Sequence, residues 1–312
     1  MPTGRAISTQ HDSAVHPTPV RSGPAVQERV HLGGVELDPL DEQQVVDWVM
    51  TGLHAGRGGW IATPNVDHLQ KCKRDPELRA LLCGADLSVP DGAPLVWASH
   101  LCGHPVPARV TGADLLWSLT RAAAQNGFSV YFLGGEPGVP ETAGRVLQQW
   151  APGLVVAGTC SPPLGFDHDP EEFARVEEQV VSARPDLVFV GLGFPKQERL
   201  IVALHDRLPA AWWLGCGAAI PFAAGAARRA PGWMGRLGLE WLYRLVHEPR
   251  RLVRRYLRED SPYALALLIR AASSVWERLP PRRPAHVVRE LGADLSRRLT
   301  SLHRAPGPRR DR

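Results

Sequence analysis

The chain has 312 residues, 44% of them hydrophobic, so it can form one sizeable core plus tails, and its net charge of only +4 excludes a generally basic protein. Its five cysteines (Cys72, Cys83, Cys102, Cys160, Cys216) are scattered and odd in number, which predicts reduced thiols rather than a disulfide framework or a zinc cluster. No run reaches about 18 apolar residues, and residues 1–30 lack a continuous apolar segment, so neither a spanning helix nor the usual secretory signal is expected.

Four regions are expected along the chain. Residues 1–28 and 279–312 contain little that could be buried, and both are predicted to be disordered tails, the second rich in Arg and Pro. Residues 29–230 are predicted to form the main domain. Residues 231–278 are predicted to form a basic, amphipathic helical appendage.

Between the tails, short β-prone runs alternate with segments of helical spacing such as Ala113–Gln125 and Thr142–Trp150. This alternation predicts an α/β, Rossmann-like fold, with a mostly parallel sheet, helices on both faces and a C-terminal Arg-rich helical appendage. Ligands of such sheets bind at the carboxyl ends of the strands, so the loops after the strands are the candidate sites. The predicted strands are Gly59–Ala62, Leu87–Pro90, Ser129–Leu133, Leu154–Ala157, Asp186–Gly191 and Trp212–Gly215.

The loops after the first two strands carry polar side chains that could act on a substrate. Thr63-Pro64-Asn65 follows the first strand and offers a hydroxyl and an amide. Asp91 follows the second strand in Pro90-Asp91-Gly92, where its carboxylate could take a proton from an acceptor hydroxyl. Turn chemistry alone also explains an Asp-Gly pair and, without further signals, is the simpler interpretation.

The loop after Ser129–Leu133 is Gly134-Gly135-Glu136-Pro137-Gly138, and a helix follows it. Its glycines would let backbone N–H groups approach an anion at the positive end of that helix, which suits a diphosphate. A tight turn explains the glycines equally well. A dinucleotide-binding loop is disfavoured, because the spacing is not G-x-G-x-x-G and no acid for a ribose stands near residues 155–158.

Asp167-His168-Asp169 has the D-x-D pattern with which many sugar-nucleotide enzymes hold Mg²⁺ or Mn²⁺. Asp169 is followed by Pro170 and two glutamates, which is typical of a helix start. The twelve histidines form no ligand cluster. We therefore expect no metal site and no cofactor.

The loop Gly191-Leu192-Gly193-Phe194-Pro195-Lys196-Gln197-Glu198 follows a strand and opens the next helix. Lys196 and Gln197 would lie at the start of that helix, beside the carboxyl edge of the sheet, within reach of a phosphate or a nucleobase. The alternative is a solvated first turn, with Glu198 complementing the helix dipole. The glycines before the Lys-Gln-Glu triplet favour a binding loop.

An arginine-rich segment runs from Arg228 to Arg258, with nine arginines against Glu240 and Glu248. Apolar residues at helical spacing lie between the arginines, interrupted at Pro249, which predicts two helices with cationic and apolar faces. Nucleic acid, anionic lipid headgroups or a diphosphate would each suit such a face. Interleaved tryptophan and leucine favour a membrane interface, and no DNA- or RNA-binding motif accompanies the arginines.

Taken together, these segments resemble the WecG/TagA/CpsF family of bacterial glycosyltransferases over roughly residues 30–258. Their order and spacing make the resemblance specific. The matching pieces are Thr63-Pro64-Asn65, Pro90-Asp91-Gly92, Arg109-Val110-Thr111-Gly112-Ala113-Asp114, Phe132-Leu133-Gly134-Gly135, Val190 to Glu198, Arg229-Ala230-Pro231 and Leu239-Glu240-Trp241-Leu242-Tyr243-Arg244.

The resemblance implies an inverting, metal-independent enzyme with residues 29–230 as its catalytic domain. It would move a sugar of the N-acetylmannosamine, uronic acid or glucose type from a UDP-sugar to a polyprenyl-diphosphate-linked acceptor, in the synthesis of teichoic acid or another cell-surface polysaccharide. The expected partners are these two substrates and an anionic membrane surface, with no nucleic acid and with homo-oligomerisation left open. The expected location is the cytoplasm, peripherally attached to the inner face of the cell membrane.

The resemblance also suggests roles for individual residues. Asp91 matches a proposed catalytic base. Thr63, Asn65, Arg109 and Gln197 match pocket residues, and the loop patterns add Gly134, Gly135, Lys196 and Glu198 to the predicted substrate-binding set. Arg244, Arg251 and Arg254 match basic residues of an appendage thought to close over the site and touch the membrane.

Two other functions are compatible with the residues alone. One is a nucleotide-sugar-modifying NAD enzyme, such as an epimerase or dehydrogenase, on a similar sheet. The other is a non-enzymatic protein that binds nucleic acid through its arginine-rich segment.

Overall fold

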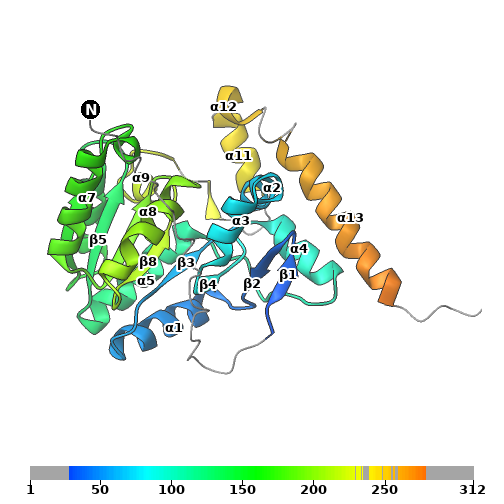
Figure 1. The fold of residues 1–312 in the computed structure, drawn as a ribbon, viewed down its shortest axis with the longest axis horizontal. Helices are drawn as coiled ribbons and strands as arrows, with labels where there is room; N and C mark the ends of the chain where they lie inside the picture. The colour runs from blue at the N-terminus through cyan, green and yellow to red at the C-terminus, as the bar shows by residue number, and fades with distance from the viewer. Residues whose placement is uncertain are drawn as a thin grey trace, which may run out of the picture.

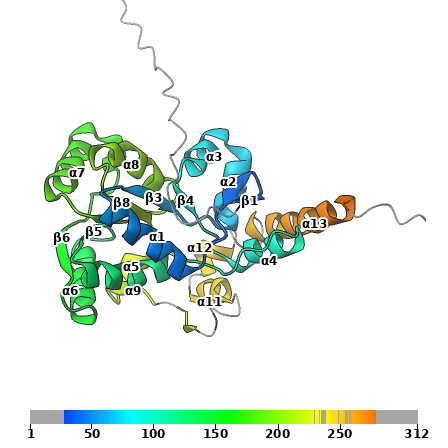
Figure 2. The same ribbon diagram turned by 90° about the horizontal axis from the view of Figure 1, so that it is seen from below.

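The computed structural model describes residues 28–228, 230–232, 234, 239–247, 249–253, 256 and 259–278. A central sheet lies between two layers of helices, and a small hairpin and the C-terminal helices lie at one side of this sandwich (Figures 1 and 2). The predicted α/β class, with a parallel sheet covered on both faces, is confirmed.

The six strands of the central sheet are arranged in the order β4-β3-β8-β7-β5-β6. Every pairing among them is parallel. All six overlap the strands predicted from the sequence. They are β3 (Gly59–Ala62), β4 (Leu87–Ser88), β5 (Ser129–Gly134), β6 (Val155–Cys160), β7 (Leu187–Gly191) and β8 (Trp212–Gly215).

Successive side chains of each strand point to opposite faces of the sheet, so one strand contributes to two cores. In β8, Trp213 packs into one core while Trp212 and Leu214 pack into the other. Because helices cover both faces, the central strands are almost continuously apolar.

The helices divide between these two cores. One layer contains α1 (Glu42–His54), α5 (Gly112–Asn126), α6 (Val139–Trp150) and α9 (Ala219–Ala223). The other contains α2 (Val66–Arg74), α3 (Pro76–Cys83), α4 (Ala93–Leu101), α7 (Pro170–Ala183) and α8 (Lys196–Leu204), together with the short helices η1 (Phe166–His168) and η2 (His205–Arg207). Figure 2 shows α2, α3, α7 and α8 on one side of the strands and α5, α6 and α9 on the other.

Local sequence sets where the helices begin. At the start of α5 the Thr111 hydroxyl accepts a hydrogen bond from the backbone N–H of Asp114 (3.0 Å). At the start of α7 the Asp169 carboxylate accepts from the backbone N–H of Glu171 (3.0 Å), and Pro170 is the first helical residue. The predicted helix start at Asp169 is therefore confirmed.

An antiparallel hairpin of β1 (Val30–Leu32) and β2 (Val35–Leu37) was not predicted from the sequence. Its two turn residues, Gly33 and Gly34, have φ angles of 60° and 88°, which glycine adopts without the strain that a side chain would cause.

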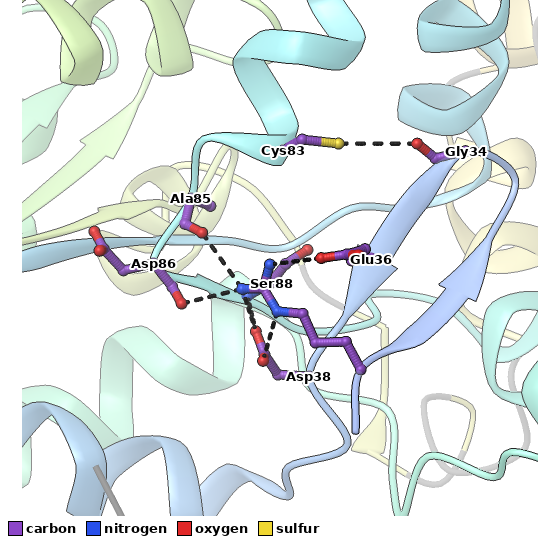
Figure 3. A network of polar contacts seen from close by, with 8 residues as sticks. Gly34, Glu36, Asp38, Cys83, Ala85, Asp86 and Ser88 are labelled. Atoms are coloured by element: carbon purple, nitrogen blue, oxygen red, sulfur yellow. Dashed lines mark hydrogen bonds and ion pairs between the residues drawn. The ribbon is translucent and has the colours of Figure 1, made fainter. Parts of the chain in front are cut away.

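A buried ionic network joins the hairpin region to β4 (Figure 3). The Arg29 guanidinium donates to both carboxylate oxygens of Asp38, at 3.0 Å each, and to the carbonyl of Asp86 (3.2 Å). Asp38 also accepts from the backbone N–H of Ser88 in β4 (2.8 Å). Burial raises the pKa of Asp38 despite the opposing charge of Arg29. The bond between Ser88 and Asp38 ties the hairpin region to β4, the strand that leads to Asp91.

The described C-terminal residues form α11 (Glu240–His247), α12 (Pro249–Val253) and α13 (Ser261–Arg278), all within the predicted appendage of residues 231–278. Helix α13 packs along α4 and buries Leu267 and Ala271, and both views show it extending away from the sandwich. Among the described residues, no helix combines the length and apolar character needed to cross a membrane.

Candidate active site at the carboxyl edge of the sheet

The loops after β3 and β4 are joined to each other and to the segment before α5. The backbone N–H of Asp91 donates to the carbonyl of Pro64 (2.8 Å), and the N–H of Val110 donates to the carbonyl of Pro90 (2.9 Å). These bonds bring three predicted motifs, at residues 63–65, 90–92 and 109–112, to one end of the sheet.

The same three motifs pack against the end of β8. The Thr63 side chain is only 7% exposed, and its hydroxyl donates to the carbonyl of Gly215 (3.4 Å). A Cβ atom on Gly112 would lie 3.0 Å from the Cα of Cys216 and 3.4 Å from the Thr63 hydroxyl. A side chain at position 112 would force the start of α5 or the strand end to shift slightly, so glycine favours this close approach.

Glycines also occupy the carboxyl ends of the neighbouring strands. A Cβ on Gly134 at the end of β5 would lie 2.5 Å from the carbonyl oxygen of Gly191, and a Cβ on Gly191 at the end of β7 would lie 2.8 Å from that of Gly217. Gly134 and Gly135 have φ angles of 114° and 90°. These contacts explain why glycine stands at both strand ends, in the loops predicted to receive a nucleotide diphosphate.

The strand order also favours a site here. From β5 the chain continues outward to β6, whereas from the adjacent β7 it continues in the opposite direction to β8. Loops that leave neighbouring strands in opposite directions open a crevice at the sheet edge, which is where open α/β sheets bind ligands.

Asp91 and Asn65 lie at the starts of helices. Asp91 is partly exposed and precedes Gly92, which has a φ of 145° and caps α4. Asn65 caps α2 by accepting a hydrogen bond from the backbone N–H of His68 (3.2 Å). Because the cap uses the side-chain oxygen of Asn65, its amide nitrogen is the group suited to donate to a ligand.

Arg109 connects the site with the C-terminal helices. Its guanidinium donates to the carboxylate of Glu240 in the first turn of α11 (3.1 Å), and each of the two side chains is 20% exposed. Helix α11 therefore reaches the predicted pocket. Of the other predicted basic residues, the side chains of Arg244 and Arg251 and the whole of Arg254 lie outside the described residues.

Lys196 is engaged with the loop before α7. Its ammonium group donates to the carboxylate of Asp167 (2.7 Å) and lies 5.7 Å from the centre of the Phe166 ring. The Lys196 side chain is 33% exposed, and its pairing with Asp167 lowers the pKa of that carboxyl. Of the two aspartates in the Asp167-His168-Asp169 pattern, Asp169 caps α7 and Asp167 pairs with Lys196.

Gln197 and Glu198 lie beneath the surface, at 3% and 2% exposure. The Gln197 side-chain oxygen accepts from the backbone N–H groups of Gly193 and Gly217, at 3.1 Å each. Its nitrogen donates to the Glu198 carboxyl (2.8 Å). Burial raises the pKa of Glu198 to about 7, although this hydrogen bond and the charge of Lys71 oppose the rise.

Two features of the site were not predicted. The first is the segment Gly215-Cys216-Gly217 at the end of a predicted strand. It has glycines after a strand, which is the pattern that indicated the other loops. Burial raises the pKa of the Cys216 thiol to about 12, so that side chain is no nucleophile. The second feature is Glu240, whose pairing with Arg109 no local pattern indicates.

Most of the chain matches one family of known proteins. A profile of the Glycosyl transferase WecG/TagA/CpsF family matches residues 30–276. A Bacillus spizizenii protein named N-acetylglucosaminyldiphosphoundecaprenol N-acetyl-beta-D-mannosaminyltransferase is 33% identical over 227 residues, covering 70% of this chain and 86% of the relative. A Bacillus subtilis protein of the same name is 30% identical over 211 residues, covering 68% and 79%.

Proposed function

Because the chain belongs to the WecG/TagA/CpsF family of glycosyltransferases, we propose that it transfers N-acetylmannosamine, or a closely related sugar, from a UDP-sugar to a polyprenyl-diphosphate-linked acceptor. The names of the two relatives support this choice of transferred sugar and acceptor, since they specify N-acetyl-beta-D-mannosamine as the sugar and N-acetylglucosaminyldiphosphoundecaprenol as the acceptor. Family membership favours this function over an NAD enzyme or a nucleic-acid-binding protein.

The observation that carries the proposal is the position of Asp91. Its carboxylate stands at the carboxyl edge of the sheet, on a loop bonded both to the Thr63-Pro64-Asn65 turn and to the segment that bears Arg109. In the proposed reaction Asp91 takes the proton of an acceptor hydroxyl. The hydroxyl oxygen bonds to the anomeric carbon, the bond from that carbon to the phosphate breaks, and UDP leaves with the electron pair.

Replacing Asp91 by Asn tests this role. The variant keeps the size and the backbone bonds of the loop but loses the base, so we expect UDP binding within about twofold of the parent and a fall in transfer of about 10²- to 10⁴-fold. Transfer is measured with a polyprenyl-diphosphate-linked N-acetylglucosamine acceptor. The exposed Asp47 of α1, changed to Asn, is the matched control and should leave transfer unchanged. Full activity of the Asp91 variant would remove that residue from the role.

The leaving nucleotide carries negative charge, which we propose is met without a divalent cation. The main-chain N–H groups at the glycine ends of β5 and β7 and the Arg109 guanidinium are suited to this task, and Arg244, Arg251 and Arg254 of the C-terminal arginine-rich segment would add positive charge. We expect full transfer in EDTA. Loss of transfer in EDTA and its return with manganese would contradict the proposal.

The acceptor's polyprenyl tail stays in the bilayer during such a reaction. We therefore propose that the protein works at the inner face of the cell membrane, in contact with anionic lipid. The exposed apolar side chains of α11, α12 and α13 support this location.

A further inference from the structure

The amide of Gln197 holds two loops together. Gly193 follows β7 and Gly217 follows β8, and both donate their backbone N–H groups to the same Gln197 oxygen. Both glycines have positive φ angles, 77° and 53°, which glycine adopts without strain. A single side chain thus fixes the spacing between neighbouring loops at the carboxyl edge.

The amide can do this in only one of its two orientations. Turned over, Gln197 would present its NH₂ group to two N–H donors, and both bonds would be lost. The Glu198 carboxyl oxygen reinforces the orientation that the two N–H donors favour, because it is an acceptor and lies 2.8 Å from the Gln197 nitrogen. Turned over, the amide would lose this third bond as well, so Glu198 holds Gln197 in the orientation in which the loops are joined.

The space around this pair is closely filled. A Cβ on Gly215 would lie 2.6 Å from the Gln197 nitrogen and 3.3 Å from the bonded oxygen of Glu198. The end of β8 thus packs against the pair from one side, and a side chain at position 215 would displace Gln197.

Glu198 is poorly placed to stabilise the fold or to touch a substrate. It is 2% exposed, and its second carboxyl oxygen has no hydrogen-bond partner among the described residues. A buried carboxyl with an unsatisfied oxygen normally destabilises a protein, because the group has lost its contact with water without gaining a partner. The presence of Glu198 at this position is therefore better explained by its hydrogen bond to Gln197 than by a contribution to stability.

We infer that Glu198 is a positioning residue: it acts through Gln197 to hold the loops after β7 and β8 together, and it does not contact the substrate. This role differs from the substrate-binding role predicted for Glu198 from the sequence. Its link to catalysis rests on the proposed function, in which these loops receive the sugar nucleotide. Loss of the orientation should then weaken donor binding more than it slows the chemical step.

The test compares four variants of the full-length protein. Glu198→Gln keeps an acceptor oxygen in place. Glu198→Met keeps the bulk and removes the acceptor, and Glu198→Asp keeps the charge but withdraws the oxygen by one methylene. Glu171→Met is the matched control, an exposed glutamate in the first turn of α7.

The direct readout is amide hydrogen exchange of Gly193 and Gly217 in protein labelled with ¹⁵N-glycine, measured without substrate. We expect exchange at both glycines to rise about fivefold or more in Glu198→Met and Glu198→Asp, the loss typical of one hydrogen bond. Glu198→Gln and Glu171→Met should stay within about twofold of the parent. If Glu198→Met does not fold, Glu198→Asp and Glu198→Gln still provide the contrast. Unchanged exchange in the variants that remove or withdraw the acceptor would overturn the inference.

A double variant separates positioning from a general loss of stability. In a Gln197→Met background the two loops are already released, so adding Glu198→Met should change exchange at Gly193 and Gly217 little further. Independent, additive effects would overturn the inference. With the UDP-sugar donor, Glu198→Met should raise KM several-fold and lower kcat by less than about twofold. The exchange measurement needs no substrate, so it tests the positioning role of Glu198 even if the proposed function is wrong.

Discussion

Burial has the largest influence on the pKa of the Glu198 carboxyl and outweighs the groups that oppose it. Burial raises its pKa from 4.5 to about 7, so between these values the unfolded chain ionises while the folded protein keeps the proton. The contribution of Glu198 to stability is thus greatest below pH 4.5 and is lost as pH rises through 7, by about 3 kcal/mol in total. Glu198→Gln cannot ionise. We predict that denaturant unfolding will show the parent losing stability relative to this variant between pH 5 and pH 8. Parallel pH profiles for the two proteins would contradict the burial argument.

At the scale of secondary-structure elements, α11 is tied to the sheet edge by the pair between Glu240 and Arg109. A nucleotide phosphate that binds Arg109 must compete with Glu240 for the guanidinium. We therefore predict that Glu240→Gln will bind UDP about two- to fivefold more tightly in calorimetry, the range expected for loss of one partly exposed ion pair. The control is Glu177→Gln, which removes the Glu177–Arg207 pair between α7 and η2 and should leave UDP affinity unchanged. Weaker UDP binding in the Glu240 variant would show that this carboxylate supports Arg109 instead of competing for it.

Across the whole molecule, large exposed apolar side chains of the described residues concentrate on the C-terminal helices and on α4, which packs against α13. They are Trp97, Leu101, Trp241, Leu242, Val246, Val253, Leu265 and Ile269. Apolar side chains beside an arginine-rich segment suit an anionic bilayer surface. We predict that Leu265→Glu combined with Ile269→Glu will reduce sedimentation with phosphatidylglycerol vesicles while the melting temperature stays within a few degrees. Leu164→Glu, at an exposed loop position after β6, is the control and should sediment as the parent does. Equal sedimentation of the α13 variant would contradict a membrane role for that face.

Much of the fold and part of the site could be predicted because their signals are local. The six strands, the cap at Asp169 and the glycine loops each depend on residues a few positions apart. The hairpin escaped prediction because its strands have three residues each, too few for a clear alternation, although Gly33-Gly34 between them is a turn signal. The roles predicted for Asp91, Thr63 and the other site residues stay predictions until the variants are measured.

The amino-acid sequence by itself determined the six strands of the central sheet, their alternation with helices, the loops rich in glycine and the family, since each is encoded in short segments and their spacing. Only the tertiary structure decided which polar groups are buried and paired. Arg109 and Glu240 are 131 positions apart, and the burial of Gln197 and Glu198 depends on the end of β8 lying against them. The physical reason is that burial and pairing arise from contacts between distant segments, and no local pattern carries that information.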